Sequence, residues 1–197
     1  MLTSVCVFCG SKSGVRPQYV AAAREMAQVL ATHGVELIYG GGHVGLMGAM
    51  ADEALAQRGR VTGVIPEHLM RPEVAHQGLT ELIVVDSMHT RKQTMASRSD
   101  AFIVLPGGFG TLEEMFEMLT WLQLRLQAKP VGLVNVAGYF DSVLEFLVHA
   151  TREGLLLPTH RDLLLVEATP PQLFARMTEY VERLKAARPA LDDISLG

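Results

Sequence analysis

Short apolar runs alternate with amphipathic helical patterns along almost the whole chain, and this alternation limits the available folds more than any other feature. The apolar runs predict strands at residues 5–9, 35–39, 61–65, 82–85, 101–105, 131–134 and 163–166. The intervening segments predict helices at residues 19–31, 46–57, 88–97, 112–127, 140–153 and 171–187. Such alternation favours parallel strands whose helical connections cover both faces of one sheet. We therefore predict an α/β fold, a Rossmann-like doubly wound parallel sheet of about seven strands.

The composition favours one compact domain and excludes some partners. The chain has 197 residues, of which 49% are hydrophobic, so we expect a single domain over 1–197 with a loose tail at 188–197. A formal net charge of −4 argues against a broad nucleic-acid or anionic-membrane surface, because those partners need a concentrated basic face. The N-terminal run lacks the basic flank of a signal peptide, and no apolar stretch is long enough for a bilayer. We expect a soluble cytoplasmic protein.

The two cysteines, Cys6 and Cys9, form a C-x-x-C string inside the first predicted strand. Side chains three residues apart on a strand point to opposite faces, so the two thiols are badly placed to bridge or to share a metal. The sequence also offers no second Cys or His cluster to complete a metal site. We predict two buried structural thiols and no metal.

Three of the predicted strands end in turns that contain glycine, at residues 10–14, 40–48 and 106–114. In a doubly wound sheet, ligands bind beyond the carboxyl ends of the strands, so all three turns lie at the expected ligand edge. Each alone could be only a tight turn, and for the first turn that interpretation is as good as the functional one. Three turns at one edge indicate a binding site.

The third turn, Pro-Gly-Gly-Phe-Gly-Thr-Leu-Glu-Glu, joins a doubly buried strand to a helix. The unpaired amides of the first helical turn and the helix dipole would stabilise an anion there. Gly108 and Gly110 would allow the backbone to approach that anion without side chains in the way. We therefore expect a phosphate to dock on the amides of Gly108, Gly110 and Thr111.

The second turn offers a competing interpretation, because Gly40-x-Gly42-x-x-Gly45 matches the dinucleotide fingerprint G-x-G-x-x-G between a strand and a helix. Glu67, after the next strand, is a candidate for the acidic residue that binds the ribose hydroxyls. However, Pro66 intervenes, the turn does not follow the first strand, and the chain is short for a dehydrogenase with a separate substrate domain. We interpret the turn as a nucleotide-facing loop of another kind.

Two adjacent cations, Arg91 and Lys92, lie in the helix that precedes the strand of the phosphate turn. They could form a solvated basic helix face, which Arg98 would continue. Alternatively, Arg91 supplies a planar fork for a phosphate or carboxylate, and Lys92 adds a point charge.

Glu114 also has a purely structural interpretation, because Thr111-x-x-Glu114 matches a capping box. On a helical wheel Glu113 and Glu117 stack together, while Glu114 lies on the flank. Three carboxylates would repel a phosphate unless cations compensate them, and Arg91 and Lys92 are the obvious compensation.

The helix after the phosphate turn is apolar nearly all round, because Phe116, Trp121, Leu124 and Leu126 add to its buried stripe. A single face of a sheet cannot cover such a helix. We expect a homodimer packed through it, with the site near the partner chain. The alternative is that the C-terminal helix at 171–187 covers it.

These motifs together resemble the LOG (Lonely Guy) family of cytokinin-activating phosphoribohydrolases, long labelled possible lysine decarboxylases. The resemblance covers nearly the whole chain. Its most specific parts are P-G-G-x-G-T-x-x-E, matched from Pro106 to Glu114, and M-H-x-R-K, matched from Met88 to Lys92. The strings F-C-G-S at 8–11 and G-G-G at 40–42, with G-L-M-G at 45–48, also match.

The resemblance implies hydrolysis of the N-glycosidic bond of adenine-type nucleoside 5′-monophosphates, and possibly of AMP, giving free base and ribose 5-phosphate. It implies Arg91 and Glu114 as the catalytic pair, a homodimer, and no cofactor. The implied or expected substrate contacts are Glu73, Lys92, Gly108, Phe109, Gly110, Thr111, Leu112, Glu113 and Thr120, together with Gly10, Ser11, Gly42 and Met88.

The proposed chemistry fits these residue types. Breaking the bond between ribose and purine develops positive charge on the sugar, which a carboxylate stabilises, or the carboxylate positions the attacking water. Arg91 could clamp the phosphate or polarise the departing base. A pyridoxal decarboxylase needs a Schiff-base lysine, and only Lys12 and Lys92 lie near the expected site. Two alternatives remain open: a non-catalytic nucleotide or molybdopterin-cofactor carrier, and a nicotinamide or flavin enzyme.

Overall fold

The computed structural model describes residues 1–71 and 74–192, and it confirms the predicted doubly wound parallel sheet. Seven strands pair in the order β4-β3-β2-β1-β5-β6-β7, and every pairing is parallel. The strands are β1 (Ser4–Phe8), β2 (Glu36–Tyr39), β3 (Val61–Pro66), β4 (Glu81–Val85), β5 (Ala101–Val104), β6 (Val131–Val134) and β7 (Leu164–Glu167).

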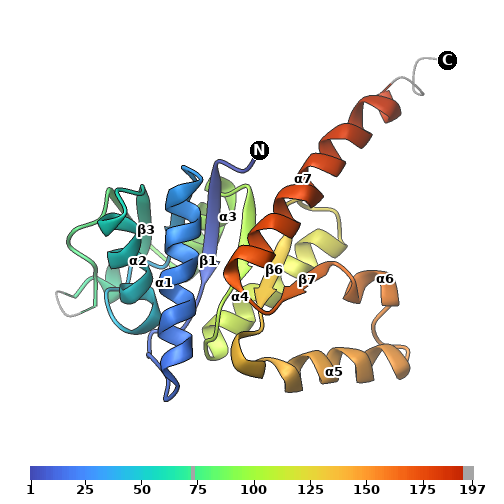
Figure 1. The fold of residues 1–197 in the computed structure, drawn as a ribbon, viewed down its shortest axis with the longest axis horizontal. Coiled ribbons are helices and arrows are strands. Elements are labelled where there is room, and N and C mark those ends of the chain that lie inside the picture. The colour runs from blue at the N-terminus through green and yellow to red at the C-terminus, as the bar shows by residue number, and fades with distance from the viewer. Residues whose placement is uncertain (72–73, 193–197) are drawn as a thin grey trace.

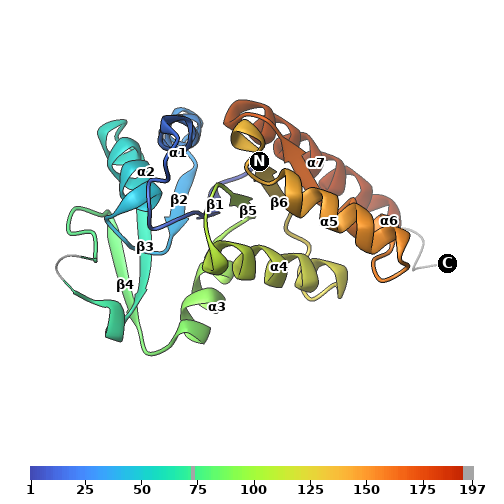
Figure 2. The same ribbon diagram turned by 90° about the horizontal axis from the view of Figure 1, so that it is seen from below.

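Helices cover both faces of the sheet, as Figures 1 and 2 show, and they connect consecutive strands except β3 and β4, between which the described residues form only one short turn. They are α1 (Pro17–Thr32), α2 (Gly45–Ala56), α3 (Met88–Arg98), α4 (Phe109–Gln123), α5 (Asp141–Arg152), α6 (Pro158–Arg161) and α7 (Pro170–Asp192), with the single turns η1 (Glu67–Leu69) and η2 (Val136–Gly138). The sequence pattern missed η1, η2 and α6, because elements this short carry no helical period.

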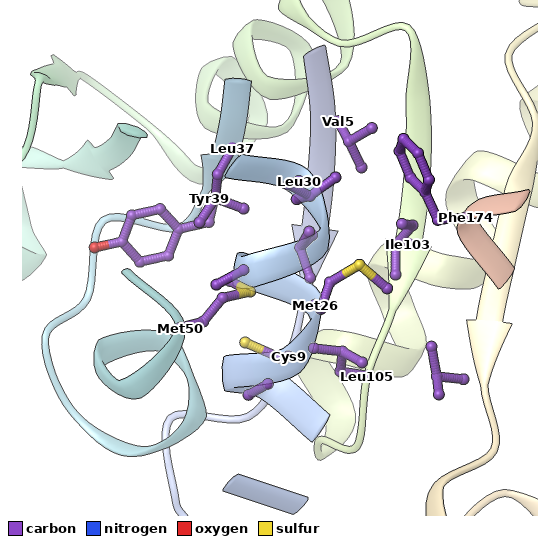
Figure 3. Packing of buried hydrophobic residues seen from close by; sticks show 14 of the residues in the cluster. Val5, Cys9, Met26, Leu30, Leu37, Tyr39, Met50, Ile103, Leu105 and Phe174 are labelled. Carbon is purple, nitrogen blue, oxygen red and sulfur yellow. The ribbon is translucent and has the colours of Figure 1, made fainter. Parts of the chain in front are cut away.

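The core has two layers, one on each side of the sheet. Residues of α1, α2 and α7 form the first layer with the sheet, and Figure 3 shows Met26 and Leu30 of α1 and Phe174 of α7 in it. Residues of α3, α4 and α5 form the second layer. Figure 2 shows α1 and α2 on one side of the strands, with α3 and α4 on the other.

The two-layer arrangement decides how α4 is covered. Helix α7 contacts α1, β6 and β7, whereas α4 packs on β1, β5 and β6 from the opposite face. The alternative that α7 covers α4 is therefore wrong. Leu124 and Leu126 remain 59% and 69% exposed, and Phe116 is also exposed, whereas Trp121 packs against the second core layer.

Helix α4 starts and ends earlier than its apolar pattern indicates. It begins at Phe109 instead of Leu112, because Gly110 adopts helical geometry although glycine usually signals a turn. It ends at Gln123 because Arg125 takes the left-handed conformation (φ 58°). The amides of Arg125 and Leu126 then donate to the carbonyls of Leu122 (3.1 Å) and Trp121 (2.9 Å), which closes the helix in a Schellman motif. The left-handed position of such a motif is usually glycine, so Arg125 gave no signal in the sequence that the helix ends here.

Both cysteines are free and buried, and they lie in different core layers, as the strand geometry predicted. Cys6 belongs to the layer of α3 and α4, and Cys9 to the layer of α1 and α2. Within the described part of the chain no helix is long and apolar enough to span a membrane. The expected loose tail at 188–197 stays a prediction, because α7 runs to Asp192 and residues 193–197 lie outside the described residues.

Candidate active site

The switch point of the sheet lies between β1 and β5, where the order of the strands reverses. The amide of Gly10, just beyond β1, donates to the carbonyl of Pro106, just beyond β5, at 2.9 Å. A cleft of about 290 Å³ opens at this edge. It is lined by Gly10, Ser11, Lys12, Ser13, Gly14, Tyr19, Leu46, Pro106, Gly107, Gly108 and Tyr139. The topology thus places the first and third glycine turns side by side, as a doubly wound sheet requires of its ligand crevice.

The N-terminus of α4 borders this cleft and presents free amides. Its first helical hydrogen bond runs from the amide of Leu112 to the carbonyl of Gly108 (3.1 Å), so the amides of Phe109, Gly110 and Thr111 have no partner within the helix. A side chain built at Gly108 or Gly110 would meet no atom within 4 Å, so open space lies beside both residues. An anion can approach the backbone there.

Glu114 lies in the second turn of α4, and the predicted capping box is absent. Gly108 is the residue that caps α4, no side chain bonds to the cap, and Thr111 is already inside the helix. The carboxyl of Glu114 is therefore not used as a cap. Burial raises its pKa from the ordinary 4.5 to about 7, although the charge of Arg91 acts in the opposite direction. A carboxyl that titrates near neutrality is typical of a functional site.

Arg91 is only 8% exposed and is held by two backbone carbonyls. Its Nε donates to the carbonyl of Val64 at 3.0 Å, and its Nη2 donates to the carbonyl of Gly40 at 2.9 Å. A Cβ atom at Gly40 would lie 1.9 Å from Nη2, so only glycine leaves room for the guanidinium. The glycine turn at 40–42 therefore leaves room for the side chain of Arg91. Two of the three guanidinium nitrogens, Nε and Nη2, already donate to backbone carbonyls.

Lys92 points to a different set of partners. Its ammonium donates to Glu113 and, at 3.0 Å, to Oε1 of Glu117, so it joins α3 to α4. The other carboxylate oxygen of Glu117 is buried without a hydrogen-bond partner. The expected compensation of carboxylates by cations is thus divided: Lys92 forms ion pairs with Glu113 and Glu117, and the charge of Arg91 acts on Glu114. A lysine held in two ion pairs stays protonated, which disfavours a Schiff-base role.

The remaining expected contacts lie at different distances from the cleft. Ser11 lines it, and Phe109 is 95% exposed at the start of α4. Met88 begins α3 and places its sulfur 3.7 Å from Nη1 of Arg91. Thr120 lies in the fourth turn of α4, where its hydroxyl donates to the carbonyl of Phe116 (2.7 Å). Gly42 pairs with Ala75 and is not among the cleft residues. Leu112 packs against the second core layer. Glu73 lies outside the described residues.

Two aromatic residues of the cleft, Tyr19 and Tyr139, were missed by the motif analysis. Their rings meet edge to face with centroids 5.3 Å apart. Tyr139 follows η2, in which Ala137 and Gly138 both have positive φ. A glycine shortly after the sixth predicted strand was the only local signal for this turn.

The α2 N-terminus is blocked, which disfavours the dinucleotide interpretation. The amides of Leu46 and Met47 donate to the carbonyl of Gly10 at 3.1 and 3.4 Å. A Cβ atom at Gly45 would lie 2.3 Å from the backbone of Ser11. The loop after β1 therefore occupies the place that a pyrophosphate takes in a dinucleotide fold. The described residues also contain no group of three or more His, Cys, Asp or Glu side chains placed to hold a metal ion.

Comparisons with known proteins agree with the motifs. A protein-family model described as "Possible lysine decarboxylase" matches residues 47–177. A probable cytokinin riboside 5′-monophosphate phosphoribohydrolase of Oryza sativa subsp. japonica is 49% identical over 177 residues, 90% of this chain and 78% of the relative. A probable enzyme of the same name from Arabidopsis thaliana is 47% identical over 92% of this chain and 90% of its own. A second Arabidopsis protein, a cytokinin riboside 5′-monophosphate phosphoribohydrolase, is 44% identical over 91% and 84% of the two chains.

Solved structures share the fold at low sequence identity. The molybdenum cofactor binding protein of Rippkaea orientalis superposes with a TM-score of 0.69 at 20% identity, over 92% of this chain and 98% of that chain. The Moco carrier protein of Chlamydomonas reinhardtii gives a TM-score of 0.69 at 21% identity, over 93% and 99%. At these identities the likeness demonstrates the shared fold alone.

Proposed function

Because the chain belongs to the family described as possible lysine decarboxylase, and its relatives in plants are cytokinin riboside 5′-monophosphate phosphoribohydrolases, we propose that it is a phosphoribohydrolase of the same kind. The reaction breaks the N-glycosidic bond of a cytokinin riboside 5′-monophosphate with water and releases the free base and ribose 5-phosphate. The observation that carries the proposal is the carboxyl of Glu114, which is partly buried, takes no part in the helix cap and lies one turn from free helix amides.

The spacing along α4 suits a ribose 5-phosphate. Four residues separate the free amide of Gly110 from Glu114, which is about 6 Å along the helix axis. Helical side chains lean toward the N-terminus, so the carboxyl of Glu114 reaches back toward those amides. A phosphate on the amides of Gly110 and Thr111 would hold the sugar beside Glu114. The ionised carboxylate then stabilises the positive charge that develops at the anomeric carbon and orients the attacking water.

Arg91 contributes to the proposed reaction mainly through its positive charge, which acts on the carboxyl of Glu114. Because Nε and Nη2 are engaged by backbone carbonyls, Arg91 is poorly placed to grip a phosphate with both arms of its fork. We assign it two tasks. It keeps part of Glu114 ionised. Its third nitrogen, Nη1, which among the described residues donates only to the sulfur of Met88 at 3.7 Å, would turn to the departing base. Lys92, paired with Glu113 and Glu117, holds α3 against α4 and so keeps Arg91 and Glu114 together.

We further propose that a second copy of the chain covers the exposed apolar residues Phe116, Leu124 and Leu126 on the side of α4.

We also propose a cytoplasmic location. The two buried free thiols support it, because free thiols suit a reducing compartment.

The decisive experiment is a product assay on the purified protein. We expect release of free base from isopentenyladenosine 5′-monophosphate and far less from the unphosphorylated riboside, with AMP run in parallel as a second substrate. Glu114→Gln should lower kcat by roughly 10²- to 10⁴-fold, because it removes the charge that the transition state requires. Glu182→Gln on α7, an exposed carboxyl far from the cleft, is the matched control. Tight binding of monophosphates without turnover would contradict the proposal and favour a carrier.

A further inference from the structure

Tyr139 contacts the phosphate turn directly and belongs to none of the motifs. Its hydroxyl donates to the carbonyl of Gly107 at 2.7 Å, across 32 positions of sequence. Gly107 immediately precedes Gly108, the residue that caps α4. The hydrogen bond therefore holds the peptide that carries the Gly108 amide, one residue before the free amides of the helix.

Packing restrains the two glycines of this peptide unequally. A Cβ atom at Gly107 would lie 2.0 Å from Oγ1 of Thr111 and 2.9 Å from the amide nitrogen of Gly10, whereas one at Gly108 would meet no atom within 4 Å, so the Gly108 end of the peptide lies in open space. The preceding peptide is already held, because the amide of Gly10 donates to the carbonyl of Pro106 at 2.9 Å. The Tyr139 hydroxyl holds the next carbonyl from the other side of the cleft. A peptide plane that can flip loses the amide orientation that an anion requires.

The segment that carries Tyr139 is itself firmly built. Ala137 adopts φ 50°, a conformation that costs free energy for a residue with a side chain. The carbonyl of Ala137 accepts a hydrogen bond from Nη1 of Arg16 at 3.3 Å. The side chain of Asn135 links the two ends of the turn at 136–139. Its amide group donates to Asp141 (2.7 Å) and its oxygen accepts from the backbone amide of Phe140 (2.9 Å). The ring of Tyr139, which is 41% exposed, packs edge to face against Tyr19 and Phe140, with centroids 5.3 and 4.8 Å away.

From this geometry we propose that Tyr139 is a positioning residue: its hydroxyl sets the Gly107–Gly108 peptide so that the α4 N-terminus binds the 5′-phosphate of the substrate. The inference rests on the proposed function, since it assigns the phosphate of that substrate to this turn. Tyr139 acts through the backbone of Gly107, so its loss should weaken phosphate binding and leave the chemistry at Glu114 intact.

The test compares the wild type with Tyr139→Phe, which keeps the ring contacts and removes only the hydroxyl. Tyr180→Phe on α7 is the matched control, because that ring packs against the core layer away from the cleft. We expect the dissociation constant of inorganic phosphate and the KM for the monophosphate to rise about 2- to 10-fold, the usual worth of one hydrogen bond. The kcat and the melting temperature should stay near the wild-type values.

Two outcomes would overturn the proposal. One is an unchanged dissociation constant for inorganic phosphate in Tyr139→Phe, whether or not the melting temperature falls. The other is a wild-type protein that binds no inorganic phosphate. Failure of the proposed function is a separate result, namely no release of base by the wild type, because phosphate binding is measured by calorimetry and needs no turnover.

Discussion

The raised pKa of Glu114 makes both the proposed reaction and the free energy of unfolding depend on pH. Burial keeps much of this carboxyl protonated near neutral pH, because its pKa is raised to about 7. In the proposed mechanism the carboxylate is the working form. The kcat/KM, which reports the free enzyme, should therefore rise about tenfold per pH unit below pH 7 and level off above it.

Measurement of kcat/KM across this range checks the pH dependence, since kcat/KM reports the ionisation of the free enzyme, to which the raised pKa of Glu114 belongs. A kcat/KM that falls as the pH rises through 7 would show that Glu114 acts as the proton donor instead. A flat profile between pH 5 and 9 would remove it from the rate-limiting step.

The same pKa shift predicts a stability effect. Between pH 4.5 and 7 the folded chain holds a proton on Glu114 that the unfolded chain has lost, so the free energy of unfolding falls as the pH rises through this window. Glu114→Gln removes the penalty of burying the charge. We expect the variant to be more stable than the wild type at pH 8, by up to about 3 kcal/mol, and equally stable at pH 4.

Thermal or urea unfolding at the two pH values measures this difference, with Glu182→Gln measured alongside as the control. If Glu114→Gln were less stable than the wild type at pH 8, the ionised carboxylate would be stabilised by its neighbours and the pKa would not be raised. An inactive but more stable variant would identify Glu114 as a residue kept for chemistry and not for folding.

At the scale of elements, the close approach between the loop after β1 and the start of α2 depends on Gly45. This residue has φ +65°, and a Cβ atom there would lie 2.3 Å from the backbone of Ser11. Gly45→Ala should therefore push the Gly10–Lys12 loop away from α2 and distort the cleft. Gly34 is the matched control, because it has φ +66° but no atom within 4 Å of an added Cβ.

We expect Gly34→Ala to cost about 1–2 kcal/mol from the left-handed backbone alone. Gly45→Ala should cost roughly 1–3 kcal/mol more from the overlap and should also raise the KM. Melting temperatures and steady-state kinetics of the two variants check this. Equal losses of stability with unchanged kinetics would mean that the loop adapts freely and that the contact does not shape the cleft.

The strands and the helix ends differ in how far the local sequence determines them. All seven strands were predicted, because a buried strand leaves a continuous apolar run. The end of α4 was not, because the left-handed residue is Arg125 and the apolar residues Leu124 and Leu126 continue the helical pattern beyond it. The structural interpretation of Thr111 and Glu114 as a capping box was also wrong, because α4 starts two residues before Thr111. Helix ends depend on single backbone angles that composition does not report.

For the whole molecule, the exposed apolar residues of the α4 side predict a dimer. Light scattering after size exclusion should give twice the 21.5 kDa mass of one chain. Leu126→Glu should shift it to the single-chain mass at little cost to the fold, because that side chain is 69% exposed in one chain. Leu184→Glu on α7, an exposed leucine on the opposite side of the sheet, should leave the dimer intact. A wild-type protein of single-chain mass would contradict the prediction.

The amino-acid sequence by itself determined the sheet, the edge that carries the site and the opposite faces of the two thiols. These follow from the strand and helix periods and from the rule that parallel strands end at one edge. Only the tertiary structure decided that Arg91 is held by Gly40 and Val64, that Glu114 is partly buried and outside the helix cap, and that Tyr139 reaches Gly107. Such contacts join residues 51, 27 and 32 positions apart. They depend on the order of the strands in the sheet, which no local period encodes.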